Sequence, residues 1–441
     1  MPQKVFMIMT VLYGLLLQMS CSAGKHIHNR KIKNQFNHSV ILNDHFTGFA
    51  LYSMDDKKII WQQNADKYFT PASNTKLFTF YTCLNMLGDS IPALKYVDRH
   101  DSLIFWGTGD PSFLHSDLKA AKAFNFLKNC GKRLFFAPGR YTDDFYGDGW
   151  AWNDYNDYYQ PEITELPLED NVAAFYTDKN DSLQVRPAYL KRFLKCDSSY
   201  HPANFRIRRD FLTNTFVYPA GKPPATFRQD VPFKTGTALT LALLQDTLKL
   251  PVTEIHLALP DSAKTIYDAN ADTVYRHMLQ PSDNFIAEQL LLVCSLARFE
   301  KLSSDSVITY AKAHFLNDLP DVPQWADGSG LSRQNLFTPR SMISLLEKIE
   351  EKVNNDSLLH SLLPEGGVAG TIRHAYNTDN GTPFIWAKTG SLNNVYNQSG
   401  YLVTRKGKHL AFSFMNNNFT RPASEVRNEM VRIITWIHDS F

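Results

Sequence analysis

The spacing of apolar side chains predicts a β-hairpin near the start of the chain and a helix after it. Residues Phe46–Tyr52 and Lys58–Trp61 flank a polar turn, as the two strands of a hairpin do. Pro71 and Gly88 then bracket a run with apolar residues at helical spacing. The same spacing predicts further helices after about residue 256, at 273–280, 284–300, 303–317 and 339–353.

The end of the chain changes back to strands before a last helix. Apolar runs at Phe384–Lys388, Gly400–Thr404 and His409–Met415 predict strands, and one apolar stripe along Ser424–His438 predicts a helix. Because a hairpin opens the chain and strands close it, we expect one sheet built from both ends.

The stretch 92–255 has a different pattern. Short apolar runs such as Leu103–Trp106 and Arg133–Phe136 alternate with turn-rich segments. Aromatic residues gather at 150–159, and packing explains them better than a ligand platform. The sequence therefore predicts an α/β domain made from residues 40–91 and 256–441, interrupted by an inserted, mostly β domain at 92–255.

Composition excludes some classes of protein. The 441 residues are 44% hydrophobic and 20% charged, which is enough apolar material for real cores in two or three domains. Lysine and arginine number 46 and aspartate and glutamate 44, so charge gives no reason to expect a nucleic-acid partner.

The first 23 residues are typical of an export signal. Lys4 is followed by an apolar run from Val5 to Met19, which is too short for a stable membrane span. Cleavage after Ala23 would give a soluble exported or periplasmic protein, and cleavage before Cys21 a lipid-anchored one. The polar, basic residues 24–40 are expected to form a loose leader to the fold.

The remaining cysteines and the histidines give no metal site. Cys83 and Cys294 lie in apolar helical runs and are expected to be buried free thiols, whereas a disulfide between Cys130 and Cys196 stays open. Metal-binding spacings such as Cys-x-x-Cys or His-Glu-x-x-His are absent from the sequence, so no metal and no cofactor is predicted.

A Ser-x-x-Lys pattern opens the first predicted helix. On a helix, residues three apart share a face, so the Ser73 hydroxyl would lie beside the Lys76 amine, which can act as its base. The pattern is weak alone and recurs at Ser22 and Ser116. Only at Ser73 does a proline precede it and an apolar helix follow.

Two further short patterns accompany it. Ser282-Asp283-Asn284 opens the long apolar helix, where it could be a hydroxyl relay or only a helix cap. Lys388-Thr389-Gly390 ends a predicted strand, where the first two side chains could hold a carboxylate and the glycine would let a substrate backbone approach. A second Lys-Thr-Gly at 234–236 is expected to be only a helix entry.

In this order the three patterns are the signature of penicillin-binding proteins and serine β-lactamases. The chain resembles one branch, the S13 D-Ala-D-Ala carboxypeptidase/endopeptidases of the penicillin-binding protein 4 type, over about residues 45–420. The resemblance rests on these patterns and on further motifs at 109–111, 149–154, 287–288, 327–333 and 390–397. It implies a transpeptidase-like fold with a central antiparallel sheet and helices.

The resemblance also implies a reaction, serine acyl transfer on peptidoglycan peptides ending in D-Ala-D-Ala. Ser73 would attack and Lys76 take its proton, while Ser282 relays a proton and Asn284 orients Lys76. Lys388, Thr389 and Gly390 would bind the substrate end, the amides of Ser73 and Ser391 would form an oxyanion hole, and Asn393 and Arg333 are candidate contacts. β-Lactam antibiotics would be inhibitors. No oligomeric state is predicted.

Two other functions stay open. A β-lactamase or esterase on the same scaffold would differ in deacylation, which these motifs do not encode. A non-catalytic peptidoglycan-binding relic would keep the fold without the reaction, although such a protein typically lacks the serine or lysine that Ser73 and Lys76 supply here.

Overall fold

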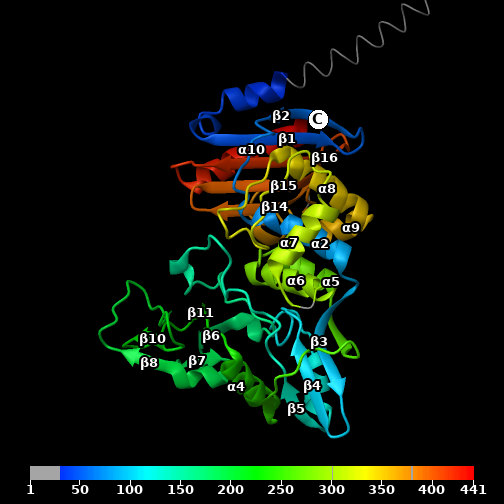
Figure 1. Cartoon of the computed structure of the whole chain (residues 1–441). Coiled ribbons are helices and arrows are strands. Elements are labelled where there is room, and N and C mark those ends of the chain that lie inside the picture. The colour runs from blue at the N-terminus through cyan, green and yellow to red at the C-terminus, as the bar shows by residue number, and fades with distance from the viewer. Residues whose placement is uncertain (1–29, 300, 379–380) are drawn as a thin grey trace, which may run out of the picture.

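The computed structural model describes residues 30–299, 301–378 and 381–441 (Figure 1). The expected export signal at 1–23, with Cys21 and Ser22, therefore lies outside the described residues. Within the described ranges, no helix has the length and apolar character needed to cross a bilayer.

One five-stranded antiparallel sheet joins the two ends of the chain. The outer hairpin pairs with the C-terminal strands through β1 and β16, as expected from the sequence. In sheet order the strands are β14 (Ile385–Leu392), β15 (Val395–Val403), β16 (His409–Asn417), β1 (Phe46–Ser53) and β2 (Lys58–Gln63).

Side chains alternate along β1 and so divide the core into two layers. Ala50 and Tyr52 face a large cluster of helices, whereas Phe49 and Leu51 face the opposite side of the sheet. Helices form the first layer: α2 (Lys76–Met86), α5 (Ala271–Leu279), α6 (Asn284–Leu296), α7 (Ser304–His314), α8 (Pro339–Val353) and α9 (Asp356–Leu362).

The opposite layer contains α10 (Ala423–Ser440) and residues 30–37, which are helical (Figure 1). Ile32 and Phe36 are buried there against Phe49 and Phe414. The expectation of a loose leader over 24–40 is therefore wrong for this part, because two apolar residues four apart anchor a helix on the sheet.

The middle of the chain forms a separate lower part with its own core (Figure 1). Its larger sheet contains β12 (Val252–Glu254), β5 (Arg133–Phe136), β4 (Ser102–Gly107), β3 (Ser90–Asp98) and β13 (Lys264–Asn270). Because β13 pairs with β3, this sheet continues to Asn270, past the expected boundary at 255. The division into domains stays a prediction.

Two small sheets and two helices complete the lower part. The helices are α3 (Lys122–Asn129) and α4 (Thr237–Leu248). One sheet contains β11 (Arg228–Pro232), β6 (Val172–Thr177) and β7 (Leu183–Arg186), and the other β8 (Leu194–Asp197), β10 (Phe216–Pro219) and β9 (Arg208–Arg209). The short 3₁₀ helices of the described residues are Leu42–Asp44, Ala72–Thr75, Trp152–Asp154, Glu169–Asn171, Ala188–Phe193 and Gly370–Ile372.

The cysteines of the described residues are all free thiols. Cys83 on α2 and Cys294 on α6 are buried as expected, with their Sγ atoms 3.7 Å apart. Cys130 and Cys196 are not joined, and the Cys130 thiol donates instead to the carbonyl of Leu127 at 3.2 Å.

Candidate active site

Ser73 lies in one turn of 3₁₀ helix (η2, Ala72–Thr75) that leads directly into α2. The turn is tight: Ala72 has a φ of 48°, in the left-handed region, and its carbonyl faces Gly330. A Cβ atom at Gly330 would lie 1.9 Å from the Ala72 oxygen, so only glycine fits against this turn. Gly390 of β14 meets the carbonyl of Pro71 in the same way. The serine turn is therefore held between two glycines.

Lys76 is fully buried at the first position of α2. Its Nζ atom lies 3.0 Å from Oγ of Ser73, 2.6 Å from Oδ1 of Asn284 and 2.8 Å from the carbonyl oxygen of Ser329. Burial lowers the pKa of Lys76 to about 8, against the opposing effect of the carboxylates of Asp283, Glu288 and Asp327. A lysine in this environment can be a neutral base near neutral pH.

Asn284 begins α6, which Asp283 caps by accepting a hydrogen bond from the backbone amide of Ile286 at 2.8 Å. Its side chain is oriented from both ends. The Oδ1 atom accepts from Lys76, and Nδ2 donates to the carbonyl of Tyr159 at 3.0 Å. The loop from the middle of the chain therefore helps to fix the amide that faces the lysine.

Ser282 and Lys388 form a second hydroxyl–amine pair. Ser282 precedes the cap with a φ of 69°, and its Oγ accepts a hydrogen bond from Lys388 Nζ at 2.8 Å. Lys388 is also fully buried, and burial together with the charge of Lys76 lowers its pKa well below the usual value. The site thus holds two serine–lysine pairs side by side.

The Lys-Thr-Gly pattern lies inside β14, because the strand continues to Leu392, and not at a strand end as expected. Gly400 pairs with Ala387, as expected for the neighbouring strand. The outer edge of β14 is bonded to Pro364 and Gly366 at Ile385 and Ala387. An extended peptide could add to this edge strand only beyond Ala387. Thr389 Oγ1 donates to Oγ1 of Thr371 at 2.7 Å.

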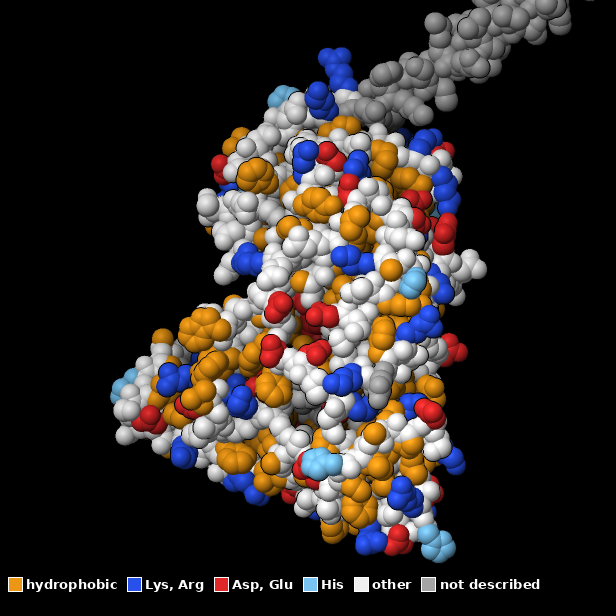
Figure 2. Space-filling view, viewed as in Figure 1, with side chains coloured by type: hydrophobic (Ala, Val, Ile, Leu, Met, Phe, Trp, Pro, Cys, Tyr) orange, Lys and Arg blue, Asp and Glu red, His pale blue; other side chains and the backbone are white. Residues whose placement is uncertain are grey.

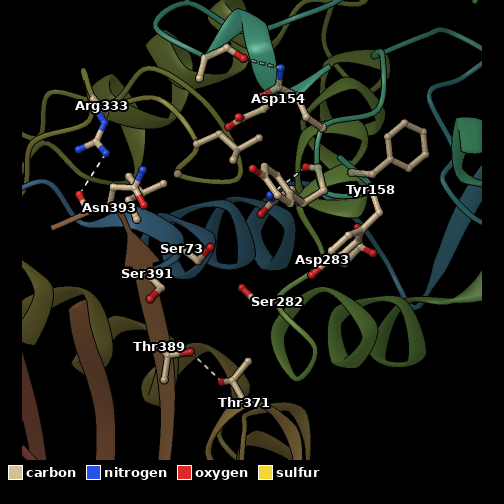
Figure 3. A pocket seen from close by; sticks show the side chains of 18 of the residues that line it. Ser73, Asp154, Tyr158, Ser282, Asp283, Arg333, Thr371, Thr389, Ser391 and Asn393 are labelled. Atoms are coloured by element: carbon tan, nitrogen blue, oxygen red, sulfur yellow. Dashed lines mark hydrogen bonds between the residues drawn. The ribbon is translucent and has the colours of Figure 1, made fainter. Parts of the chain in front are cut away.

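These groups surround a cavity of about 790 Å³ between the upper and lower parts of the molecule. Its walls include Ser73, Ser282, Thr389 and Ser391, whose side chains lie around the same space in Figure 3. Lys76 and Lys388 lie behind this wall, because both are fully buried. The serine hydroxyls therefore line the cavity, and the two lysine amines lie directly behind them.

The opposite wall comes from the lower part and carries acidic and aromatic residues, among them Asp154, Tyr158 and Tyr159. Figure 2 shows acidic side chains gathered along the hollow at this junction. Arg333 and Asn393 lie at the cavity as well, and the guanidinium of Arg333 donates to the backbone carbonyl of Asn393 at 3.1 Å (Figure 3).

The two competing short patterns that the structure describes do not reach this site. Ser116 and Lys119 are both exposed on the surface. Lys234-Thr235-Gly236 precedes α4, as expected, and holds a different group: the amide and hydroxyl of Thr235 both donate to the buried carboxylate of Glu162, at 2.7 Å each. This Lys-Thr-Gly pattern therefore has a structural role, because it holds Glu162 in the segment that follows Tyr159.

Several groups at the site could not be chosen from the sequence. Two are backbone carbonyls, those of Ser329 and Tyr159, and no side-chain pattern marks a carbonyl. Thr371 comes from a one-turn helix at Gly370–Ile372 without a motif. Among the described residues, no group of histidine, cysteine, aspartate and glutamate side chains could hold a metal ion.

Two carboxypeptidases are similar to this chain over most of its length. "Penicillin-sensitive carboxypeptidase A" of Dictyostelium discoideum is 24% identical over 81% of this chain and 80% of its own length. "D-alanyl-D-alanine carboxypeptidase DacB" of Haemophilus influenzae is 24% identical over 88% of each chain.

Solved structures share the fold. Penicillin-binding protein 4 of H. influenzae superposes with a TM-score of 0.73 at 22% identity, covering 92% of this chain and 99% of that one. A predatory peptidoglycan endopeptidase of Bdellovibrio bacteriovorus reaches 0.50 at 13% identity, covering 88% and 91%. These matches confirm the expected transpeptidase-like α/β fold.

A family model matches almost the whole described chain. The model is that of the D-Ala-D-Ala carboxypeptidase 3 (S13) family, and it covers residues 29–437, including all the serine, lysine and asparagine side chains described above. The family expected from the three short patterns is thereby confirmed. The chain belongs to the D-Ala-D-Ala carboxypeptidase 3 (S13) family.

Proposed function

We propose that this protein is an exported serine D-Ala-D-Ala carboxypeptidase with endopeptidase activity, which acts on peptidoglycan peptides through a covalent acyl-enzyme on Ser73. The observation that carries the proposal is the 3.0 Å contact between Ser73 Oγ and the amine of the buried Lys76. Membership of the S13 family and the name of the Dictyostelium relative support both the reaction and its sensitivity to penicillin.

The first half of the reaction uses the groups around Ser73. Neutral Lys76 takes the hydroxyl proton as Ser73 Oγ forms a bond to the carbonyl carbon of the penultimate D-Ala. The amides of Ser73 and Ser391 would stabilise the oxyanion, each worth about 3 kcal/mol in the transition state. A Cβ atom added to Gly390 would lie 3.1 Å from the amide nitrogen of Ser73. The serine turn and β14 are therefore close enough for their amides to face one oxyanion.

The leaving group is the terminal D-Ala or, in an endopeptidase reaction, the amine of a cross-link. Ser282 lies where it can pass a proton to that amine, and Lys388 holds its oxygen. Lys388 and Thr389 would bind the terminal carboxylate, with Gly390 on β14 and Asn393 and Arg333 past its end as further contacts. Water then attacks the acyl-enzyme and releases the shortened peptide.

Intact-mass spectrometry of the mature protein, before and after penicillin, tests the proposal. Ser73→Ala is the test variant. Its matched control is Ser116→Ala, which removes the exposed serine of a competing Ser-x-x-Lys pattern. We expect one stable adduct on wild type and on Ser116→Ala, and none on Ser73→Ala. Wild type and Ser116→Ala should also release D-alanine from a peptide ending in D-Ala-D-Ala, and Ser73→Ala should not.

Two other outcomes would replace the proposal. Rapid loss of penicillin without a lasting adduct would favour a β-lactamase or esterase on this scaffold. Neither adduct, nor turnover of penicillin, nor release of D-alanine would favour a peptidoglycan-binding relic.

A further inference from the structure

The amine of Lys76 has three oxygen neighbours, although a neutral amine has only two hydrogens and one lone pair. To accept the Ser73 proton, the lone pair must point at Ser73 Oγ, which is 3.0 Å away. The two hydrogens must then be taken by Asn284 Oδ1 at 2.6 Å and the Ser329 carbonyl at 2.8 Å. Both of these oxygens are acceptors only. The position of the Ser329 carbonyl therefore helps to decide where the lone pair points.

The two peptide groups that precede the Ser329 carbonyl are held by the side chain of Glu288. Glu288 lies on α6, one turn after Asn284, and is buried. Its Oε2 atom accepts from the amide of Gly328 at 2.9 Å, and Oε1 accepts from the amide of Ser329 at 2.8 Å. Two successive amides are thus fixed by one side chain. The same helix reaches Lys76 directly through Asn284 and indirectly through Glu288.

We propose that Glu288 is a positioning residue for Lys76: by holding the amides of Gly328 and Ser329 it fixes the backbone of Ser329, from which the Ser329 carbonyl reaches Nζ. The inference rests on the proposed function, because it needs Lys76 to be the base. Glu288 does not line the cavity, and its hydrogen bonds go to the amides of Gly328 and Ser329, so it acts through the backbone of this loop.

The neighbouring Asp327 completes the clamp, because the Gly330 amide that it holds belongs to the same peptide group as the Ser329 carbonyl. Its Oδ1 atom accepts from the amide of Gly330 at 2.7 Å, and Oδ2 accepts from the amide of Ser332 at 2.6 Å and from Nε1 of Trp150 at 2.9 Å. Two buried carboxylates therefore hold the loop whose Gly330 packs on the Ser73 turn and whose Ser329 holds Lys76.

The charges around Lys76 and Glu288 set the direction of any effect of pH on acylation. Asp283, Glu288 and Asp327 raise the pKa of Lys76, and the amine of Lys388, whose own pKa is lowered by burial and by Lys76, is the other basic group at the site. Burial and the Asp327 carboxylate raise the pKa of Glu288 to about 8, and the amides of Gly328 and Ser329 oppose that rise. Where Glu288 is ionised, removal of its charge should therefore lower the pKa of Lys76.

Glu288→Gln is the sharpest variant. Glutamine has one oxygen and one NH₂ group, so one of the two amides would face a donor in place of an acceptor. We expect single-turnover acylation by a chromogenic cephalosporin to slow at least about tenfold, since misplacing a catalytic group is costly. We also expect the acid limb of the pH–rate profile to move to lower pH.

The chain offers a matched control in Glu165, whose Oε1 and Oε2 atoms accept from the successive amides of Gly139 and Arg140 at 2.8 and 3.0 Å, outside the catalytic groups. Glu165→Gln should leave both the rate constant and its pH profile unchanged. A Glu288→Asp variant covers the case in which Glu288→Gln does not fold. It keeps the charge but shortens the reach, so acylation should slow without a shift of the acid limb.

The exponential rate constant separates this role from simple destabilisation, which lowers the amplitude by reducing the fraction of active protein. An unchanged rate constant and pH profile in the Glu288 variants would overturn the inference even if the amplitude fell. Wild-type protein that is not acylated at all would instead overturn the proposed function, so the two failures are distinguishable.

Discussion

Lys388 Nζ donates a hydrogen bond to Ser282 Oγ at 2.8 Å and joins strand β14 to the turn before α6, 106 residues away. Because the serine oxygen accepts from the lysine, its own hydrogen is free to point elsewhere. The Ser282 hydroxyl lines the cavity, so that hydrogen can be offered to a leaving amine. The lysine is fully buried near a second buried lysine, an arrangement that favours chemistry at the expense of stability.

Lys388→Met should therefore abolish activity and stabilise the fold. Methionine has a similar reach but no amine, and removing a buried ionisable group whose charged form is disfavoured by the fold is expected to add about 1 kcal/mol or more to the free energy of unfolding. Because the folded-state pKa of Lys388 is lowered, its protonation favours the unfolded state at every pH below the unfolded value. The gain should be present at pH 7 and shrink as the pH rises toward 10.5.

Thermal unfolding of wild type and Lys388→Met at pH 7 and pH 10 measures this effect. D-Alanine release measures the accompanying loss of activity, expected to be about a hundredfold or more in kcat/KM. A variant that is less stable than wild type at pH 7 would contradict the account of Lys388 as a destabilising buried cation.

Acylation of Ser73 should depend on pH in one direction over the neutral range. Lys76 must be neutral to accept the hydroxyl proton, and its pKa is lowered to about 8. Below that pH the fraction of neutral lysine falls, so the acylation rate constant should fall about tenfold per pH unit and level off above about 8. Stopped-flow acylation between pH 6 and 9 checks this. A flat profile over that range would exclude Lys76 as the base.

Gly330→Ala should damage the site without touching any catalytic side chain. Gly330 has a φ of 86°, and an added Cβ would lie 1.9 Å from the carbonyl oxygen of Ala72, the residue before Ser73. The serine turn must then move, so acylation should slow by about a hundredfold. The rate constant for acylation by penicillin is the measurement.

Gly407→Ala is the control, because Gly407 has a φ of 76° but nothing within 4 Å of the added Cβ. It should cost only about 1 kcal/mol of stability through backbone strain and leave acylation unchanged. Equal effects of the two substitutions on the acylation rate would show that strain alone, without the clash at Ala72, accounts for the loss.

The central sheet could be predicted because its sequence signals are local and strong. Helix α8 has the predicted bounds, Pro339–Val353, since Thr338 caps it and proline occupies its first position. Strand β14 was predicted too short. Its pairing with β15 continues from Ile385 to Leu392, past the glycine that was taken for its end.

Other parts of the fold gave weaker signals. Strand β13 has few apolar residues and is recognisable only by its pairing with β3, which is distant in sequence. At the site, the side chains of Ser73, Lys76 and Asn284 follow from motifs. The carbonyls of Ser329 and Tyr159 do not, because their role depends on backbone direction and not on residue identity.

The thiols should react in an order set by burial. Cys196 is exposed and Cys130 partly exposed, whereas Cys83 and Cys294 are fully buried. Burial also raises the pKa of the Cys294 thiol well above its usual value, which suppresses the reactive thiolate. In the native protein, a disulfide reagent should modify Cys196 first and Cys130 more slowly. Cys83 and Cys294 should react only after unfolding in denaturant.

Peptide mass mapping after timed labelling, without added reductant, measures this order. A matched sample labelled in denaturant should show all four thiols modified, which proves that none was blocked. If Cys130 and Cys196 stay unlabelled even in denaturant until a reductant is added, they form a disulfide in the exported protein, contrary to the free thiols described above. Fast labelling of Cys83 or Cys294 would instead show that the α2–α6 contact opens in the native state, a motion that would also separate Lys76 from Asn284.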